Sequence, residues 1–485
     1  MNWKAVLKIL GKILIAEAAM LLLPIIVAAV YHEATYWGYL IPLFILLALG
    51  VPTYFIQAEH EEKKIYAKEG FAIVAFAWLL MAAIGALPFV ITKAIPHYID
   101  ALFETISGFT TTGASVLSDV ESLPKSVLFW RSFTNWIGGM GVLVFVLAVL
   151  PKENSGIIHA FRAEATGPTV GKLTSKMGRT ARILYAIYIA LTLLEFLLLL
   201  VKIPVFDAIT TAIANAGTGG FSVKNASIAS YGSLYVEIVV SVFMFLFSLN
   251  FNIYFLILTK HVLKALKSEE AITYTSVVVV SIFAIAANIY FSAETAISNF
   301  GDAMRYSSFQ VLSLSSTTGF SSIDYNGWPT LSKVILLFLM MTGGMAGSTA
   351  GGIKMSRLML LTKSTAADVR KMVHPREVIT LKFEGEPVLE NTIQNVRIFF
   401  VTWVGILILC TLLISIEGYG DFLTNFSASL SCVSNIGPGF NLVGPAANFS
   451  GYSYVSKIIL SLEMLFGRLE IFPLIVLFSP ATYRK

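Results

Sequence analysis

The sequence predicts an all-α protein that crosses a membrane many times. Its 485 residues are 56% hydrophobic and only 13% charged, and the mean hydropathy is +0.77. Soluble domains carry roughly 25% charged residues, and a globular core cannot hide so large an apolar excess. Apolar runs of roughly 20 residues, the length that spans a bilayer, alternate with short polar stretches. These observations exclude a soluble enzyme.

Ten apolar runs are long enough to be transmembrane helices. They lie near residues 10–31, 36–56, 70–92, 126–150, 181–201, 233–259, 273–292, 331–357, 397–416 and 454–479. Basic residues concentrate in alternate connections, which the positive-inside rule assigns to the cytoplasm. These basic connections are 63–68, 152–182, 260–267, 357–376 and 484–485. An even number of spans then places both termini in the cytoplasm, and the scattered basic residues do not indicate nucleic-acid binding.

Four of the external connections contain an apolar stretch that is too short to cross, followed by glycine with threonine or asparagine. They read IDALFETISGFTTTGA, FDAITTAIANAGTGGF, GDAMRYSSFQVLSLSSTTGF and GDFLTNFSASLSCVSNIGPGF, beginning at Ile99, Phe206, Gly301 and Gly420. The four stretches predict an internal repeat of span, short helix, glycine turn and span. An aspartate near the start of each stretch is suited to cap the short helix. These aspartates are Asp100, Asp207, Asp302 and Asp421.

The predicted organisation is therefore two leading spans and four repeats around one axis. The leading spans occupy residues 1–68, and the repeats occupy 69–151, 152–262, 263–358 and 359–485. Both cysteines, Cys410 and Cys432, lie in apolar stretches, so the sequence contains neither a disulfide framework nor a CxxC metal pair.

The glycine turns are the candidate functional site. Irregular backbone at membrane depth is tolerated where it lines a water-filled cavity, and four such turns around one axis make a pore. Their small residues let backbone carbonyls point inward and replace the hydration shell of a cation. The candidate residues are Thr110, Thr111, Thr112 and Gly113; Thr218, Gly219 and Gly220; Ser316, Thr317, Thr318 and Gly319; and Ser434, Asn435, Ile436 and Gly437. In the second turn Gly217 is an alternative to Gly220. The spacing from Asp207 favours Gly220.

Together with NWIGGMG from Asn135 and SNIGPGF from Ser434, the repeats carry a resemblance over nearly the whole chain. The sequence resembles the Trk/Ktr/HKT superfamily of potassium transporters, and in particular its TrkH-type membrane subunits. The resemblance implies that Gly113, Gly220, Gly319 and Gly437 are filter glycines and that K⁺ binds at the filter turns and crosses a bacterial inner membrane. Glycine rather than serine at position 113 implies preference for K⁺ over Na⁺. Because the turns share little beyond one glycine, we expect Rb⁺ to pass as well.

The segment TGGMAGSTAGG, residues 342–352, interrupts the second span of the third repeat. Its glycine spacing suits close helix packing, but each glycine costs about 1 kcal/mol relative to alanine in a helix, which favours an unwound segment below the filter. It lacks the GK[ST] ending of a phosphate-binding loop. The resemblance implies an intramembrane gating loop. The candidate gate residues are Thr342, Gly343, Gly344, Gly347, Ser348, Gly351 and Gly352, with Arg468 from the last span.

Arg468 has two interpretations, because a charge inside a span is costly and needs a partner. It pairs with Glu463 or Glu470 near the cytoplasmic end, or it faces the pore and donates hydrogen bonds to carbonyls of the Gly-rich segment.

No polar segment is large enough to be a regulatory domain. The resemblance implies a homodimer with one pore per chain and a separate cytosolic ring of the TrkA type that binds the nucleotide, either ATP/ADP or NAD. The chain itself is expected to bind no cofactor other than transported K⁺.

The main alternative is an H⁺- or Na⁺-coupled symporter. The four repeats enter from the same side, unlike the inverted halves of such transporters, and the best midplane carboxylate, Glu104, occurs in one copy only. The sequence leaves passive and coupled flux open. An enzyme is disfavoured because no HExxH or GxSxG motif occurs.

Overall fold

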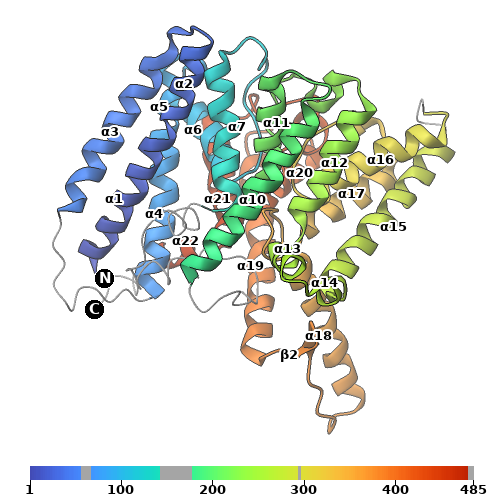
Figure 1. Ribbon diagram of the computed structural model, residues 1–485. Helices are drawn as coiled ribbons and strands as arrows, with labels where there is room; N and C mark the ends of the chain where they lie inside the picture. The colour runs from blue at the N-terminus through green and yellow to red at the C-terminus, as the bar shows by residue number, and fades with distance from the viewer. Residues whose placement is uncertain (56–66, 142–176, 293–296, 479–485) are drawn as a thin grey trace.

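The computed structural model describes residues 1–55, 67–141, 177–292 and 297–478 (Figure 1). Within these ranges the protein is helical apart from one antiparallel hairpin of β1 (Lys382–Phe383) and β2 (Glu386–Pro387). The expected basic segments 152–176 and 484–485, and most of 63–68, lie outside the described residues.

Six of the ten expected spans are long apolar helices. They are α1 with α2 (Trp3–Met20 and Leu22–Val30), α3 (Trp37–Tyr54), α4 with α5 (Ala67–Gly85 and Leu87–Ile91), α10 (Met177–Leu199), α15 (Glu269–Phe291) and α19 (Glu390–Ser415). Among the described residues, length and apolarity support these six spans, or seven if a bent pair is counted as one. Large side chains such as Leu197, Val280 and Leu412 are exposed on them, as expected of surfaces that face lipid.

Four short helices lie where the repeats were expected. They are α6 (Tyr98–Phe109), α11 (Val205–Ala216), α16 (Phe300–Ser315) and α20 (Phe422–Ser434). With 12 to 16 residues they are about 18–24 Å long, too short to cross a bilayer. Of the four predicted aspartate caps only Asp421 is correct, since it accepts the Thr424 N–H at 2.9 Å. The other three aspartates lie within the first turn, where a negative charge still favours the helix dipole.

The second helix of each repeat is shorter than the sequence predicts. These helices are α7 (Lys125–Gly139), α12 (Leu234–Ser248), α17 (Thr330–Thr342) and α21 (Tyr454–Arg468). The sequence predicted a break only in the third, yet all four end after 13 to 15 residues. The chain turns by 90° between α12 and α13 (Phe251–Leu258). After α21, Glu470 and Ile471 take positive φ before α22 (Phe472–Phe478).

The four short helices and the helices that follow them pack in a closed cycle. Each short helix contacts the helix that follows it and the one that follows the preceding short helix: α11 packs on α7, α16 on α12, α20 on α17, and α6 on α21. The contact between α6 and α21 joins the first repeat to the last. The long helices α10, α15 and α19 lie outside this cycle, and α1 to α3 flank it at one side, in blue in Figure 1.

The remaining elements lie at the two ends of the bundle. They are α14 (Val262–Leu266), α18 (Met355–Val373) and the 3₁₀ helices η1 (Ala34–Tyr36), η3 (Ser227–Tyr231), η4 (Tyr325–Gly327) and η5 (Asn441–Val443). The hairpin and the far end of α18 project from the end at which the N-terminus lies (Figure 1).

Candidate functional site

Four turns of the same backbone shape follow the short helices. We call them the glycine turns and define them as residues 110–113, 217–220, 316–319 and 434–437. The second residue of each has a left-handed φ of 53–57°, and the fourth is a glycine with φ of 65–107°. The left-handed residues are Thr111, Thr218, Thr317 and Asn435, and the glycines are Gly113, Gly220, Gly319 and Gly437. Gly217, the alternative in the second turn, has a helical φ of −69°, so Gly220 is the structural counterpart of Gly113.

Each turn ends its helix with the same pair of backbone hydrogen bonds. In the first turn the Thr111 N–H donates to Gly108 O at 3.0 Å and the Thr112 N–H donates to Ser107 O at 2.8 Å, and the other turns repeat both bonds. This is the Schellman ending, whose left-handed position usually holds glycine. A β-branched residue there is an outlier and stores strain of about 1–3 kcal/mol. Three of the four turns hold threonine at this position.

The glycines hold the four turns together as a ring. A Cβ atom added to Gly113 would lie 2.2 Å from Gly219 O in the second turn. The same construction links Gly220 to Thr318 O at 2.0 Å, Gly319 to Ile436 O at 2.0 Å, and Gly437 to Thr112 O at 2.8 Å. Each turn therefore places a backbone carbonyl against the glycine of the preceding turn, and the cycle closes from the fourth turn to the first.

A cavity lies on one side of this ring. All four turn glycines line it, together with polar residues of the segments that follow them, among them Ser115, Ser222, Asn225 and Ser321. Exposed residues such as Asn225 and Ala447 are part of the lining, so the cavity reaches the surface. An ion in the cavity would therefore meet the four glycines.

A buried ion pair holds the segments that follow the first two glycine turns. Arg131 Nε lies 2.5 Å from Glu104 Oε1, and these side chains are 5% and 0% exposed. Arg131 also donates to Ser222 O at 2.8 Å and stacks 3.7 Å above the Phe221 ring. Glu104 also accepts the Val116 N–H at 2.9 Å. Glu104, the carboxylate considered for proton coupling, is thus engaged in a structural pair that fixes the segment after the second turn.

The Gly-rich segment 342–352 is unwound, as the sequence predicted. Thr342 ends α17, and residues 343–354 form a loop before α18. The Gly351 N–H donates to Thr317 Oγ1 at 2.6 Å, and a Cβ atom on Gly351 would lie 2.2 Å from Ser434 O. The loop therefore lies directly against the third and fourth glycine turns, on their helix side.

The same loop fills the break between α12 and α13. The Met345 N–H donates to Ser248 O at 3.0 Å, and Thr349 Oγ1 donates to Phe247 O at 3.1 Å. In return the Phe251 N–H donates to Gly347 O at 3.0 Å. The N–H and C=O groups left unpaired at the break between α12 and α13 thus form hydrogen bonds with the loop, as buried backbone groups require.

Arg468 donates a hydrogen bond to a carbonyl of the loop, which is one part of the second interpretation. Nη1 donates to Thr349 O at 2.9 Å, and Nη2 donates to Gly139 O at 2.7 Å and also to Gly138 O. Its cation thereby also caps the carboxyl end of α7, where a positive charge is favoured. Glu470 pairs with Arg357 at 2.5 Å, and Glu463 accepts from Ser429 Oγ at 2.6 Å.

Sequence reasoning missed two charged residues at the loop. Lys354 is 2% exposed, has a φ of 80° and donates to Ala350 O. Glu270, 3% exposed, accepts the Ala346 N–H at 2.8 Å. Lys354 lies two residues after the end of the Gly-rich run, which is a usable signal. Glu270 is 76 residues away in the chain, and no local pattern links it to the loop.

Comparisons with known proteins agree with this architecture. The family TrkH, described as a cation transport protein, matches residues 40–483. The chain is 33% identical to the Trk system potassium uptake protein TrkH of Salmonella typhimurium, with 100% of both chains covered. It is 31% identical to the Trk system potassium uptake protein TrkG of Escherichia coli, with 95% of each covered.

A solved structure gives the same result in three dimensions. The crystal structure of the potassium transporter TrkH from Vibrio parahaemolyticus matches with a TM-score of 0.88 and 31% identity, covering 100% of both chains. The resemblance inferred from the sequence is confirmed. The chain belongs to the TrkH family of cation transport proteins and is an ion transporter rather than an enzyme.

Proposed function

We propose that this chain is the membrane subunit of a Trk-type potassium uptake system and that K⁺ crosses through a pore along the axis of the glycine turns. The names of its relatives support the ion. The observation that carries the pore is the ring in which each turn glycine meets a carbonyl of the next turn. Converging carbonyl oxygens replace the hydration shell of a cation.

The proposed selectivity filter consists of the residues of the four glycine turns other than Gly217. They are Thr110, Thr111, Thr112, Gly113, Thr218, Gly219, Gly220, Ser316, Thr317, Thr318, Gly319, Ser434, Asn435, Ile436 and Gly437. Backbone oxygens of these residues are the K⁺ ligands. The four turns share a backbone shape but not a sequence. The electrostatic field that their carbonyls exert on an ion is therefore less uniform than that of four identical loops, and Rb⁺ is expected to pass.

The proposed gate is the loop with its arginine. Thr342, Gly343, Gly344, Gly347, Ser348, Gly351 and Gly352 form the movable part, and Arg468 holds it closed. The hydrogen bond from Gly351 to Thr317 supports this role, because it puts the loop in direct contact with the filter. The positive charge of Arg468 also repels cations that approach the filter from the side of the loop.

The proposed organisation of the chain is two leading spans and four pore repeats, ten spans in total, with the boundaries given above. The second span of each repeat is taken as a broken helix. Both termini are proposed to lie in the cytoplasm of a bacterial cell, with the chain in the inner membrane. The subunit is proposed to act as a homodimer with a cytosolic ring of the TrkA type that binds ATP/ADP or NAD.

Radioactive Rb⁺ uptake into liposomes that contain only this chain tests the function. With a K⁺-loaded interior and no proton or sodium gradient, we expect uptake that external K⁺ blocks far better than Li⁺. Uptake that appears only when a proton or sodium gradient is applied would replace the passive pore by a coupled symporter.

A further inference from the structure

We propose that Glu270 and Glu384 are positioning residues that connect the β-hairpin at the end of the bundle to the loop at the filter. Glu270 holds the loop, and Glu384 holds the helix turn that carries Glu270. The inference rests on the proposed role of the loop as a gate, and it adds the element from which the gate is controlled.

Glu270 joins the two ends of the loop. One carboxylate oxygen, Oε1, accepts the Ala346 N–H at 2.8 Å and the Ser356 N–H at 3.0 Å. Ser356 lies in the first turn of α18, whose N-cap residue Lys354 makes no capping bond through its side chain. Glu270 thus caps α18 from another helix. A loop that moves away from the filter has to break or stretch the Ala346 bond, while the Ser356 bond keeps Glu270 fixed to the start of α18.

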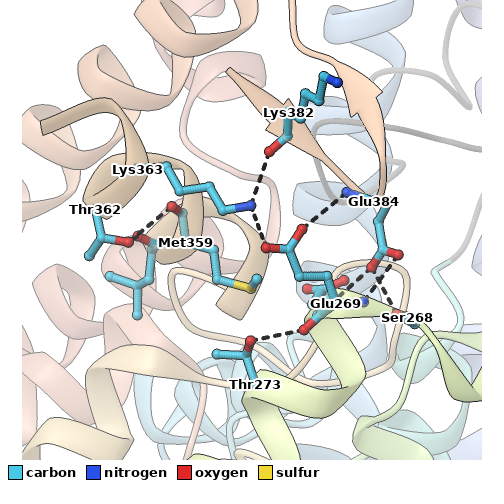
Figure 2. A network of polar contacts seen from close by, with 10 residues as sticks. Ser268, Glu269, Thr273, Met359, Thr362, Lys363, Lys382 and Glu384 are labelled. Carbon is cyan, nitrogen blue, oxygen red and sulfur yellow. Dashed lines mark hydrogen bonds and ion pairs between the residues drawn. The ribbon is translucent and has the colours of Figure 1, made fainter. Parts of the chain in front are cut away.

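Glu384 caps the helix from which Glu270 extends. It stands at the tip of the hairpin with a left-handed φ of 53°. Its carboxylate accepts Ser268 Oγ–H at 2.8 Å, the Glu269 N–H at 3.2 Å and the Glu270 N–H at 3.0 Å (Figure 2). The first turn of α15 therefore has donors satisfied by the hairpin in addition to its own Ser268 cap.

A second set of bonds locks the hairpin to α15 and α18. The Glu384 N–H returns a bond to Glu269 Oε2 at 3.3 Å, so the two glutamates cap each other. Lys363 of α18 donates to Glu269 and, at 3.0 Å, to Lys382 O of the hairpin (Figure 2). The hairpin is therefore held by the two helices that also hold the loop.

These contacts form a continuous path from the surface to the filter. It runs from Glu384 to the first turn of α15, from Glu270 to the loop, and from Gly351 to Thr317. A displacement of the hairpin removes acceptors from the α15 turn and shifts the Glu270 carboxylate relative to the loop. The hairpin is solvent-exposed at Glu384 and Glu386, so a force applied from outside the bundle reaches the gate by this path.

The test measures Rb⁺ flux in liposomes for Glu270→Gln and Glu384→Gln. Glutamine keeps an acceptor oxygen but loses the charge, so the bonds from the Ala346 and Ser356 N–H groups weaken, and the initial rate should rise roughly tenfold for Glu270→Gln, with a smaller increase for Glu384→Gln. Glu386→Gln is the matched control, because it removes one charge from the same hairpin but leaves the α15 cap intact, and its flux should equal wild type. The Rb⁺/Na⁺ ratio should stay unchanged in all three, which a general loosening of the protein would not allow.

Two further variants separate this inference from the gate itself. If the path is serial, the double variant should conduct no faster than Glu270→Gln alone, because residues of one network are not additive. In a chain whose loop is trimmed, neither substitution should change flux. A trimmed loop that raises flux while both single variants behave as wild type would overturn the inference and keep the gate. Unchanged flux after trimming would overturn the gate. If Glu270→Gln does not fold, Glu384→Gln decides the outcome alone.

Discussion

Threonine at the left-handed position of the glycine turns connects local strain to function. A glycine would relieve the strain at Thr317, but it would remove the hydroxyl that accepts the loop N–H from Gly351. The sequence located these turns because TTG-like segments recur at similar spacing. It did not predict which residue is left-handed, because intrinsic preference points to glycine there, and the surrounding buried packing overrides it.

Gly113→Ser should lower the preference for K⁺ over Na⁺ by about tenfold, since the added Cβ meets Gly219 O at 2.2 Å and must push the second turn outward. Competition of Rb⁺ uptake by K⁺ and Na⁺ measures the ratio. Gly232→Ser, at an open surface turn with φ of 55° and no atom within 4 Å of the added Cβ, is the control for backbone strain alone. An unchanged ratio in Gly113→Ser would show that the first turn is not part of the filter.

Arg468→Ala should raise Rb⁺ flux by about tenfold, because charged hydrogen bonds to Thr349 O and to the end of α7 are lost. The Rb⁺ flux of Arg468→Lys should lie between that of wild type and that of Arg468→Ala. The lysine ammonium keeps the charge but cannot make the several hydrogen bonds of the planar guanidinium. If Arg468→Ala only lowers the amount of folded protein, measured by gel filtration, then the arginine is structural and the loop is held by other contacts.

Broken helices are the feature of the elements that sequence reasoning found least well. The break after α17 was predicted because five glycines interrupt one span. The breaks at α7, α12 and α21 involve fewer helix-breaking residues, such as Gly138 and Asn250, within stretches that read as continuous apolar spans. They are stabilised by distant partners, the loop for α12 and Arg468 for α7.

Shortening the loop by removing residues 345–350 should raise Rb⁺ flux, because the contacts of Thr349 to Phe247 and Arg468 are lost and Gly351, whose N–H donates to Thr317, is pulled out of place. The rate of uptake is measured at equal protein density in the liposomes. A deletion of similar length in segment 444–449, which lines the cavity, or in segment 374–379, which connects α18 to the hairpin, would itself disturb the proposed machinery, so the wild-type chain is the control. If the loop-shortened chain and wild type have equal Rb⁺ flux, the loop does not gate the pore.

Over the whole molecule, the sequence predicted four repeats around an axis but not their order or their contacts. Ion pairs join helices that belong to different predicted repeats. Arg305 of the third repeat pairs with Glu237 of the second at 2.6 Å, and Lys457 of the fourth pairs with Asp100 of the first at 2.7 Å. Each of these charges looks isolated in its own apolar stretch. Their partners are 68 and 357 residues away, so the pairs can be recognised only once the chain is folded.

Removing K⁺ should lower the thermal stability of the detergent-solubilised protein. An ion held by carbonyls from all four repeats stabilises only the closed ring, and saturation at 100 times the dissociation constant contributes about 2.7 kcal/mol. Tm in K⁺ should exceed Tm in Li⁺ at equal ionic strength, and Gly113→Ser should narrow the difference. Equal Tm values in the two salts would argue against a K⁺ site shared by the repeats.

The closure between Gly437 and Thr112 also has a consequence for biosynthesis. The ring acquires its last side only when the fourth repeat has been translated and inserted, so a chain that ends at residue 358 should give no Rb⁺ uptake in vesicles. Its open side would leave carbonyls and N–H groups facing lipid, which is costly, so we expect the product to be unstable and open to proteolysis. Interrupted synthesis therefore yields a degradable fragment rather than a leak, and the cell keeps its ion gradients while the transporter is being made.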